Sequence, residues 1–219
     1  MTETQGVFIS FEGGDGSGKS TQLNLLAEHL EKEGFRLIKN AEPGGTAIGQ
    51  QIRRILLDPE NNEMSPMTEL LLMFASRAQA VEERIRPMLR QGGIVLSDRF
   101  TDSSLAYQGE ARGLGFEVVR ALHALALGPI QPDLTVYIDV DLETSLARAY
   151  GRNHEAGAGA ERRLDEQSMA FHRRVREGYR RIAAEEPQRF KIVDGWEAPE
   201  VVAQRVWDLV IPQLKKVKG

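Results

Sequence analysis

The chain lacks several features that would point to particular classes of protein. Its 219 residues include no cysteine, which excludes disulfide bonds, thiolate catalysis and cysteine-ligated zinc. Four scattered histidines show no metal-ligand spacing. No apolar run approaches the ~20 residues that a membrane helix needs, and the first residues lack the basic start and apolar core of a signal peptide. We therefore expect a soluble cytoplasmic protein with no membrane partner.

Composition and charge are those of an ordinary globular protein. Hydrophobic residues make up 41% of the chain and charged residues 27%. The net charge of −4 argues against a nucleic-acid polymer as partner. A chain of this length can bury one sizeable core, and it contains no repeat and no linker long enough to divide it. We expect a single domain over residues 1–219.

The strongest signal is a glycine-rich loop between a short apolar run and a helical pattern. Residues 7–11 read as a buried strand, and leucines at helical spacing follow the loop. The spacing Gly13, four residues, Gly18-Lys19-Ser20 is that of a phosphate-binding loop. Lysine reaches the β- and γ-phosphates in such loops, and the serine hydroxyl ligates Mg²⁺. We expect the phosphates of a nucleoside triphosphate to be held by Gly13, Gly14, Asp15, Gly16, Ser17, Gly18, Lys19, Ser20 and Thr21.

Strand-like runs and helical patterns alternate along the rest of the chain. The expected strands are residues 7–11, 35–40, 94–97, 134–140 and 190–194. Thr46 is expected to cap the helix that follows the second strand. Pro87 is expected to kink one helix, and another is expected to reopen at Arg162 after a small-residue stretch, residues 151–160. This alternation predicts an α/β protein of the P-loop NTPase type, a three-layer α/β/α arrangement with a five-stranded parallel sheet. The small-residue stretch suits a flexible lid over the triphosphate, at about residues 149–164.

Charged positions outside the loop favour transfer between two phosphates. The GTPase base-reading motif is missing, and no apolar run ends in the Asp-Glu pair of many hydrolytic ATPases. Asp98-Arg99 instead follows the third expected strand, at the sheet edge where ligands bind, and Asp98 joins Ser20 as a candidate metal ligand. Guanidinium groups neutralise the repulsion between donor and acceptor phosphates. Candidate arginines stand at 53, 77, 99, 148, 152, 162 and 163.

Four short motifs, in order, resemble those of bacterial thymidylate kinases. They are Glu42-Pro43-Gly44-Gly45-Thr46, Asp98-Arg99-Phe100, Ser103-Ser104-Leu105-Ala106-Tyr107-Gln108-Gly109 and Arg163-Leu164-Asp165. The resemblance runs from the first strand to the last helix. It implies phosphoryl transfer from ATP to dTMP, giving dTDP, with Mg²⁺, and it also implies a homodimer.

The resemblance assigns roles to individual positions. It implies that Asp15 holds the 3′-hydroxyl of the acceptor sugar and that Arg99 grips the acceptor phosphate, with Arg53 and Glu42 lining the same pocket. Arg77 corresponds to the arginine that reads the thymine carbonyl, and Ser104 and Gln108 lie near the ring edge. Tyr107 resembles the aromatic residue that crowds the sugar's 2′ position and so disfavours ribonucleotides. Either Phe74 or Met73 stacks on the base, and a core position is an equal alternative for Phe74.

The resemblance also leaves some positions open. The phosphate loop has Gly16 where some members carry the catalytic arginine, so the lid must supply it. Arg163 and Arg152 are the candidates, with Arg162 as runner-up. Arg148 and the turn at Trp196 resemble the surfaces that sandwich adenine, although Trp196 equally suits a packing role. Ala41 stands where many relatives have arginine.

Two alternatives remain beside a thymidylate kinase. One is another nucleoside monophosphate or deoxynucleoside kinase of the same fold. The other, from a different class, is a non-catalytic nucleotide sensor or switch, which would bind without turnover. A dimer surface is expected on the apolar helix that contains Val118, Leu122 and Leu125, unless these residues are buried in the monomer.

Overall fold

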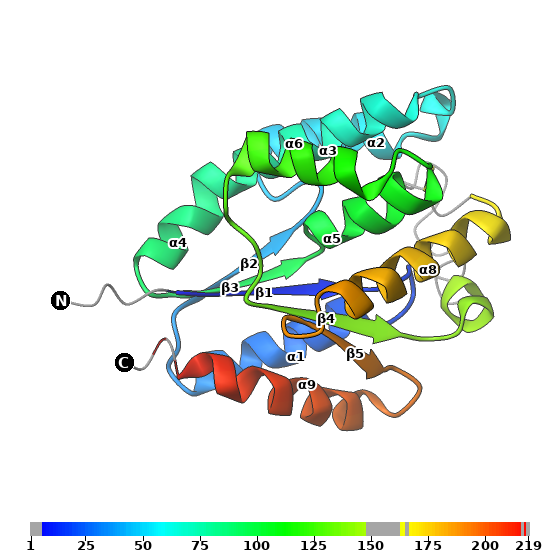
Figure 1. Cartoon of the computed structure of the whole chain (residues 1–219). Coiled ribbons are helices and arrows are strands. Elements are labelled where there is room, and N and C mark those ends of the chain that lie inside the picture. Colours follow the sequence, from blue (N-terminus) through cyan, green and yellow to red (C-terminus); the bar gives the residue numbers. More distant parts are fainter. Residues whose placement is uncertain (1–5, 148–162, 165–166, 216, 218–219) are drawn as a thin grey trace.

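A central parallel sheet separates two layers of helices in the computed structural model (Figure 1). The structure describes residues 6–147, 163–164, 167–215 and 217. Five strands pair in the order β2-β3-β1-β4-β5, all parallel. The strands are β1 (Val7–Glu12), β2 (Leu37–Ala41), β3 (Ile94–Asp98), β4 (Leu134–Asp139) and β5 (Phe190–Asp194). All five expected strands are therefore confirmed, with ends that differ from the expected ones by at most two residues.

Helices fill the connections between the strands. The main helices are α1 (Lys19–Lys32), α2 (Ala47–Leu57), α3 (Pro66–Ala80), α4 (Arg86–Arg90), α5 (Thr101–Ser104), α6 (Phe116–Leu127), α8 (Met169–Glu185) and α9 (Pro199–Leu214). A 3₁₀ turn follows α2 (Pro59–Asn61), π-helical segments follow α3 (Val81–Ile85) and α5 (Leu105–Ala111), and residues 142–147 are helical. In the described part of the chain, none of the helices has the length and apolar character to cross a membrane.

Each face of the sheet carries its own hydrophobic core because side chains alternate along the strands. On β1, Val7, Ile9 and Phe11 pack with α1 and α9. Phe8 points the other way, into the core shared with α3, α6 and α8. Figure 1 shows α1 and α9 below the sheet and α3, α6 and α8 above it. Glu12 shares the face of Phe8, so β1 ends in a buried carboxylate on the upper side.

Serine and threonine side chains begin several helices. Thr46 Oγ1 accepts a hydrogen bond from Gly49 N at 3.0 Å, as the sequence predicts for the start of α2. Ser168 Oγ accepts from Phe171 N at 3.2 Å and begins α8. Arg162 lies outside the described residues, but the continuous helix expected from that point onward is not present in the described residues that follow it. Arg163 lies in a turn instead, and the helix starts only where the Ser168 cap is available.

The irregularity expected at Pro87 lies earlier in the chain. The helix that begins at Pro66 passes through a π-helical segment at Val81–Ile85 and continues as α4, whose second residue is Pro87. Proline has no N–H to donate to the preceding turn. The widened turn therefore stands immediately before the proline, and the helical path continues beyond it.

Candidate active site

The phosphate loop begins where β1 ends, between β1 and α1. Gly13, Gly16 and Gly18 have φ values of 152°, 81° and 91°, a region that other residues resist. A Cβ at Gly13 would lie 2.5 Å from Ser17 Oγ and 2.8 Å from Ile138 O, so the loop requires glycine there. The sequence prediction of a strand, loop and helix is confirmed. The loop presents its N–H groups at the start of α1, the geometry that binds phosphates.

Lys19 and Ser20 lie at the head of α1. Lys19 is buried, and its Nζ lies 3.4 Å from Gly14 O and 3.5 Å from Asp15 Oδ1. Ser20 Oγ donates to Asp98 Oδ2 at 2.5 Å. The contact joins two residues that are 78 positions apart in the sequence, because β3 pairs directly with β1. It brings a hydroxyl and a carboxylate together, oxygen donors of the kind that Mg²⁺ prefers.

Arg99 stands at the carboxyl end of β3 in a left-handed conformation, with φ of 72°. Its Nη2 donates to Asp15 Oδ1 at 2.9 Å, which joins it to the phosphate loop. Its guanidinium carbon lies 5.1 Å from the centre of the Tyr107 ring. Burial opposes the charge, but Tyr107 and Asp15 raise the pKa of Arg99, so the group stays cationic. The arginine expected to grip an acceptor phosphate therefore lies beside the donor loop.

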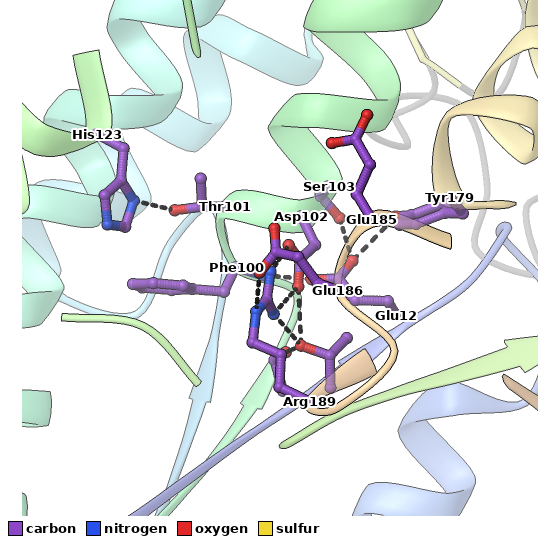
Figure 2. A network of polar contacts seen from close by, with 12 residues as sticks. Glu12, Phe100, Thr101, Asp102, Ser103, His123, Tyr179, Glu185, Glu186 and Arg189 are labelled. Carbon is purple, nitrogen blue, oxygen red and sulfur yellow. Dashed lines mark hydrogen bonds and ion pairs between the residues drawn. The ribbon is translucent and has the colours of Figure 1, made fainter. Parts of the chain in front are cut away.

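Glu12 is a site residue that the sequence analysis missed. Its carboxylate is fully buried and accepts hydrogen bonds from Phe100 N at 2.8 Å, Ser103 Oγ at 2.5 Å and Tyr179 Oη at 2.9 Å. Figure 2 shows the Ser103 and Tyr179 hydroxyls converging on it. Burial, reinforced by the nearby Asp102 carboxylate, raises the pKa of Glu12 to about 7. Arg99 and the donors act in the opposite direction.

Arg77 is held by a separate set of partners on the α3 side. Its side chain is 2% exposed and forms an ion pair with the equally buried Glu42. It also donates to Ser104 Oγ at 3.0 Å and to Phe100 O at 3.1 Å. The guanidinium carbon lies 4.7 Å from the centre of the Phe74 ring. The structure therefore brings together three residues assigned to the base, Arg77, Ser104 and Phe74.

Two assigned residues have partners other than a phosphate. Glu42, expected beside the acceptor phosphate, is paired with Arg77. Arg53 Nη1 donates to Pro43 O at 2.9 Å, so it lies on the turn that follows Glu42. Phe74 packs in the core above the sheet, whereas Met73 belongs to a small cluster with Leu56 and Leu57.

Another buried carboxylate, that of Glu69 on α3, contacts two arginines and a glutamine. Gln108 Nε2 donates to Glu69 Oε1 at 2.9 Å, and Arg112 Nη2 lies 3.1 Å from Oε2. Arg163 Nη2 lies 2.7 Å from the same oxygen, and the Arg163 side chain is only 2% exposed. Its backbone N–H donates to Leu57 O at 3.3 Å. The expected lid arginine is thus anchored between α2 and α3 in this structure.

The remaining predicted positions are less informative. Arg148 and Arg152 lie outside the described residues, as does most of the expected lid. Trp196 is 56% exposed, so it is not a packing residue in this chain. Within the part of the chain that the structure describes, no three His, Cys, Asp or Glu side chains group as a metal site.

A phosphate loop that contacts a second, arginine-lined site across the sheet edge defines an ATP-dependent phosphotransferase of the nucleotide kinase class. Comparison with known proteins specifies the family. The thymidylate kinase family model matches residues 11–206. The chain therefore belongs to the thymidylate kinase family.

Individual relatives are similar over nearly their whole length. A thymidylate kinase from Pelobacter propionicus is 50% identical over 201 residues, 92% of each chain. One from Caldanaerobacter subterraneus is 47% identical over 214 residues, 98% of this chain and 99% of that one. The crystal structure of thymidylate kinase from Ehrlichia chaffeensis superposes with a TM-score of 0.75 at 32% identity, covering 94% of this chain and 98% of that one.

Proposed function

We propose that the protein transfers the γ-phosphate of ATP to the phosphate of dTMP, giving dTDP and ADP. An oxygen of the dTMP phosphate attacks the γ-phosphorus, and the bond from that phosphorus to the β–γ bridging oxygen breaks. The acceptor is already anionic near neutral pH, so no general base is needed. Family membership and the 2.9 Å contact between Arg99 and Asp15 support this proposal, because the contact joins the donor loop to the acceptor pocket.

On the donor side, the loop amides and Lys19 bind the triphosphate and neutralise charge as it develops on the leaving group. Ser20 and Asp98 would hold Mg²⁺, with phosphate oxygens and water as its further ligands. Their adjacent oxygens, 2.5 Å apart, fit that ion. When bound, the ion supplies electrostatic stabilisation of the phosphates.

On the acceptor side, Arg99 binds the dTMP phosphate and Asp15 accepts a hydrogen bond from the 3′-hydroxyl. Arg77, held by Glu42, donates to the thymine carbonyl, with Ser104 and Gln108 at the ring edge. Phe74 or Met73 stacks on the base, and Tyr107 excludes a 2′-hydroxyl. Arg53 lines the phosphate pocket. The motif positions and the side-chain clusters described above support these proposed roles.

A lid arginine is proposed to neutralise the transferred phosphoryl group, and Arg163 and Arg152 are the candidates. Arg163 must leave the Glu69 carboxylate to act in this way. Replacing each arginine by alanine separates the two. The residue that acts in the transition state is the one whose loss lowers kcat by orders of magnitude with little loss of dTMP binding.

The functional dimer is proposed to form through α6. Val118 and Leu125 on this helix are 38% and 85% exposed, while Leu122 is partly buried against the core. An exposed leucine flanked by a second exposed apolar residue suits contact with another copy of the chain. Location in the cytoplasm stays a prediction.

An acceptor panel tests the proposed reaction. Steady-state rates are measured with dTMP, dUMP, dCMP, AMP and thymidine in the presence of ATP and Mg²⁺. We expect dTMP to have the highest kcat/KM by a wide margin. A better rate with thymidine would indicate a deoxynucleoside kinase, and nucleotide binding without turnover would indicate a sensor.

A further inference from the structure

The buried Glu12 carboxylate has no part in the reaction described above, yet it lies directly beneath the acceptor site. It ends β1 on the face that points toward α5 and α8. Burying an ionisable group costs free energy unless partners compensate it. The partners of Glu12 all lie next to Arg99: one is the backbone N–H of Phe100, the residue that follows it, and the others are two hydroxyl groups that contact its guanidinium.

The first link is through the backbone. Arg99 N donates to Phe11 O at 2.9 Å, and the next N–H, that of Phe100, donates to Glu12 Oε1 at 2.8 Å. The end of β1 therefore fixes both peptides that flank Arg99. A non-glycine residue with positive φ is strained, and it persists only where its surroundings determine the conformation. Glu12 provides part of that constraint, together with Phe11 O and with Ser97 Oγ, which donates to Arg99 O at 2.7 Å.

The second link is through two hydroxyl groups. Ser103 Oγ and Tyr179 Oη lie within hydrogen-bond distance of Glu12 Oε2 (Figure 2). Arg99 Nη1 donates to the same two oxygens, at 3.1 Å and 3.2 Å. A hydroxyl has one proton and two lone pairs. When each proton points down to an ionised carboxylate, the lone pairs are left to accept from the guanidinium above.

We propose that Glu12 is a positioning residue for phosphoryl transfer. Its ionised carboxylate sets the direction of the Ser103 and Tyr179 hydroxyls, and these hold the Arg99 guanidinium in place against the acceptor phosphate. The inference rests on the proposed function, because it takes Arg99 as the residue that binds that phosphate.

Protonation of Glu12 reverses part of this arrangement. The neutral carboxyl must donate its own proton, and the hydroxyl that accepts it has to redirect its proton elsewhere. The charged or titratable groups around Glu12 are Asp102 on α5, Arg99 above it, Tyr179 on α8 and Tyr107 beside Arg99. Asp102 is itself paired with Arg189, at 2.7 Å. Since burial and Asp102 raise the pKa of Glu12 to about 7, the change occurs at an accessible pH.

Glu12→Gln is the direct test, because it keeps the shape and one acceptor oxygen for Phe100 N. Its NH₂ group donates toward the two hydroxyls where the carboxylate accepted. We expect kcat/KM for dTMP to fall roughly 10- to 100-fold, the effect of a misplaced reacting group, with KM for ATP changed by less than about twofold. Tyr179→Phe, which removes one of the two hydroxyls, should give a smaller loss of the same kind.

A double-mutant cycle separates positioning from general damage. If Glu12 acts through Arg99, Glu12→Gln should lower kcat/KM for dTMP by less than about threefold in an Arg99→Lys background. Asp102→Asn is the matched control: it removes another buried carboxylate of the same network, whose ion-pair partner is Arg189. Measured well above pH 7, where Glu12 is ionised whether or not Asp102 is present, its effect should be the same in both backgrounds. The dissociation constant of dTMP, measured by calorimetry, completes the cycle if turnover of Arg99→Lys is too slow.

The pH dependence gives an independent readout. The titration of dTMP contributes equally to wild type and to Glu12→Gln, so the ratio of their kcat/KM values reports Glu12. We expect kcat/KM of the wild type divided by kcat/KM of Glu12→Gln to rise as the pH increases through about 7. A constant ratio, or additive effects of Glu12→Gln and Arg99→Lys, would overturn the inference. Failure of the proposed function is distinguishable, because the wild-type enzyme would then not favour dTMP at all.

Discussion

Glu12 should make the protein less stable as the pH rises, and the size of this effect follows from its surroundings. The pKa of the folded-state carboxyl is about 7, against an ordinary value of 4.5. Between these values the folded protein binds more protons at this site than the unfolded chain does, so stability is lost as the pH rises. A difference of about 2.5 between the two pKa values corresponds to about 3 kcal/mol in total.

Glu12→Gln removes this titration and gives the comparison. We expect the free energy of unfolding of the variant, minus that of wild type, to increase by about 3 kcal/mol between pH 4.5 and pH 8. Differences in hydrogen bonding that do not depend on pH cancel in this increase. For a chain of this size, it corresponds to a relative gain of roughly 6–12 °C in melting temperature at the higher pH.

The assay is urea unfolding of both proteins at half-unit steps of pH, followed by circular dichroism. The slope m must match between the two proteins, so that the comparison concerns stability alone. Parallel stability curves would refute the reasoning, because they would mean that Glu12 titrates alike in the folded and unfolded chains.

Three further predictions concern the rest of the site and the proposed dimer. Glu42→Ala should lower the free energy of unfolding by roughly 3 kcal/mol or more, because it leaves the buried Arg77 charge without its carboxylate. Urea titration measures this loss, and a value below about 1 kcal/mol would contradict the prediction. Lys19→Met should reduce kcat by orders of magnitude in a coupled ADP-release assay while the melting temperature stays close to that of wild type; retained turnover would remove the lysine from the mechanism. Leu125→Glu should convert the proposed dimer to a monomer, measured as a halved mass in light scattering, because it places a charge on the exposed apolar face of α6. The control Ile211→Glu, on α9 in the opposite helix layer, should leave the mass unchanged. An unchanged mass for Leu125→Glu would exclude the α6 face as the dimer surface.

Local sequence signals were sufficient for the sheet and for the phosphate loop. Parallel strands that are buried on both faces are continuous apolar runs, and Ile94–Asp98 and Leu134–Asp139 are of this kind. The phosphate loop can be recognised in the sequence because its backbone requires glycine at particular positions, as at Gly13. Helix starts were predictable where a capping residue was recognised, as at Thr46, and wrong where Ser168 was overlooked.

The buried carboxylates of the site could not be found in this way. Glu12 has partners 91 and 167 positions further along the chain, so no spacing in the sequence marks it. Glu42 was expected beside the acceptor phosphate, but its partner in the structure is Arg77, 35 positions away. Burial decides these pairings, because an ionised side chain that is removed from water must find an opposite charge or a set of donors. Such partners are set by the packing of whole elements.

Two adjacent residues at the end of β3 connect the two halves of the reaction. Asp98 contacts Ser20 at the head of α1, on the donor side, and Arg99 contacts the loop residue Asp15 from the acceptor side. The left-handed backbone at Arg99 turns the chain between them. Because these residues are consecutive in the chain at the end of β3, the distance between donor and acceptor sites is set by rigid backbone. A constraint of this kind is what in-line transfer requires, since positioning supplies much of the rate. The strain at Arg99, of order 1–3 kcal/mol, is then offset by the Glu12 carboxylate and Phe11 carbonyl that hold the adjacent peptides.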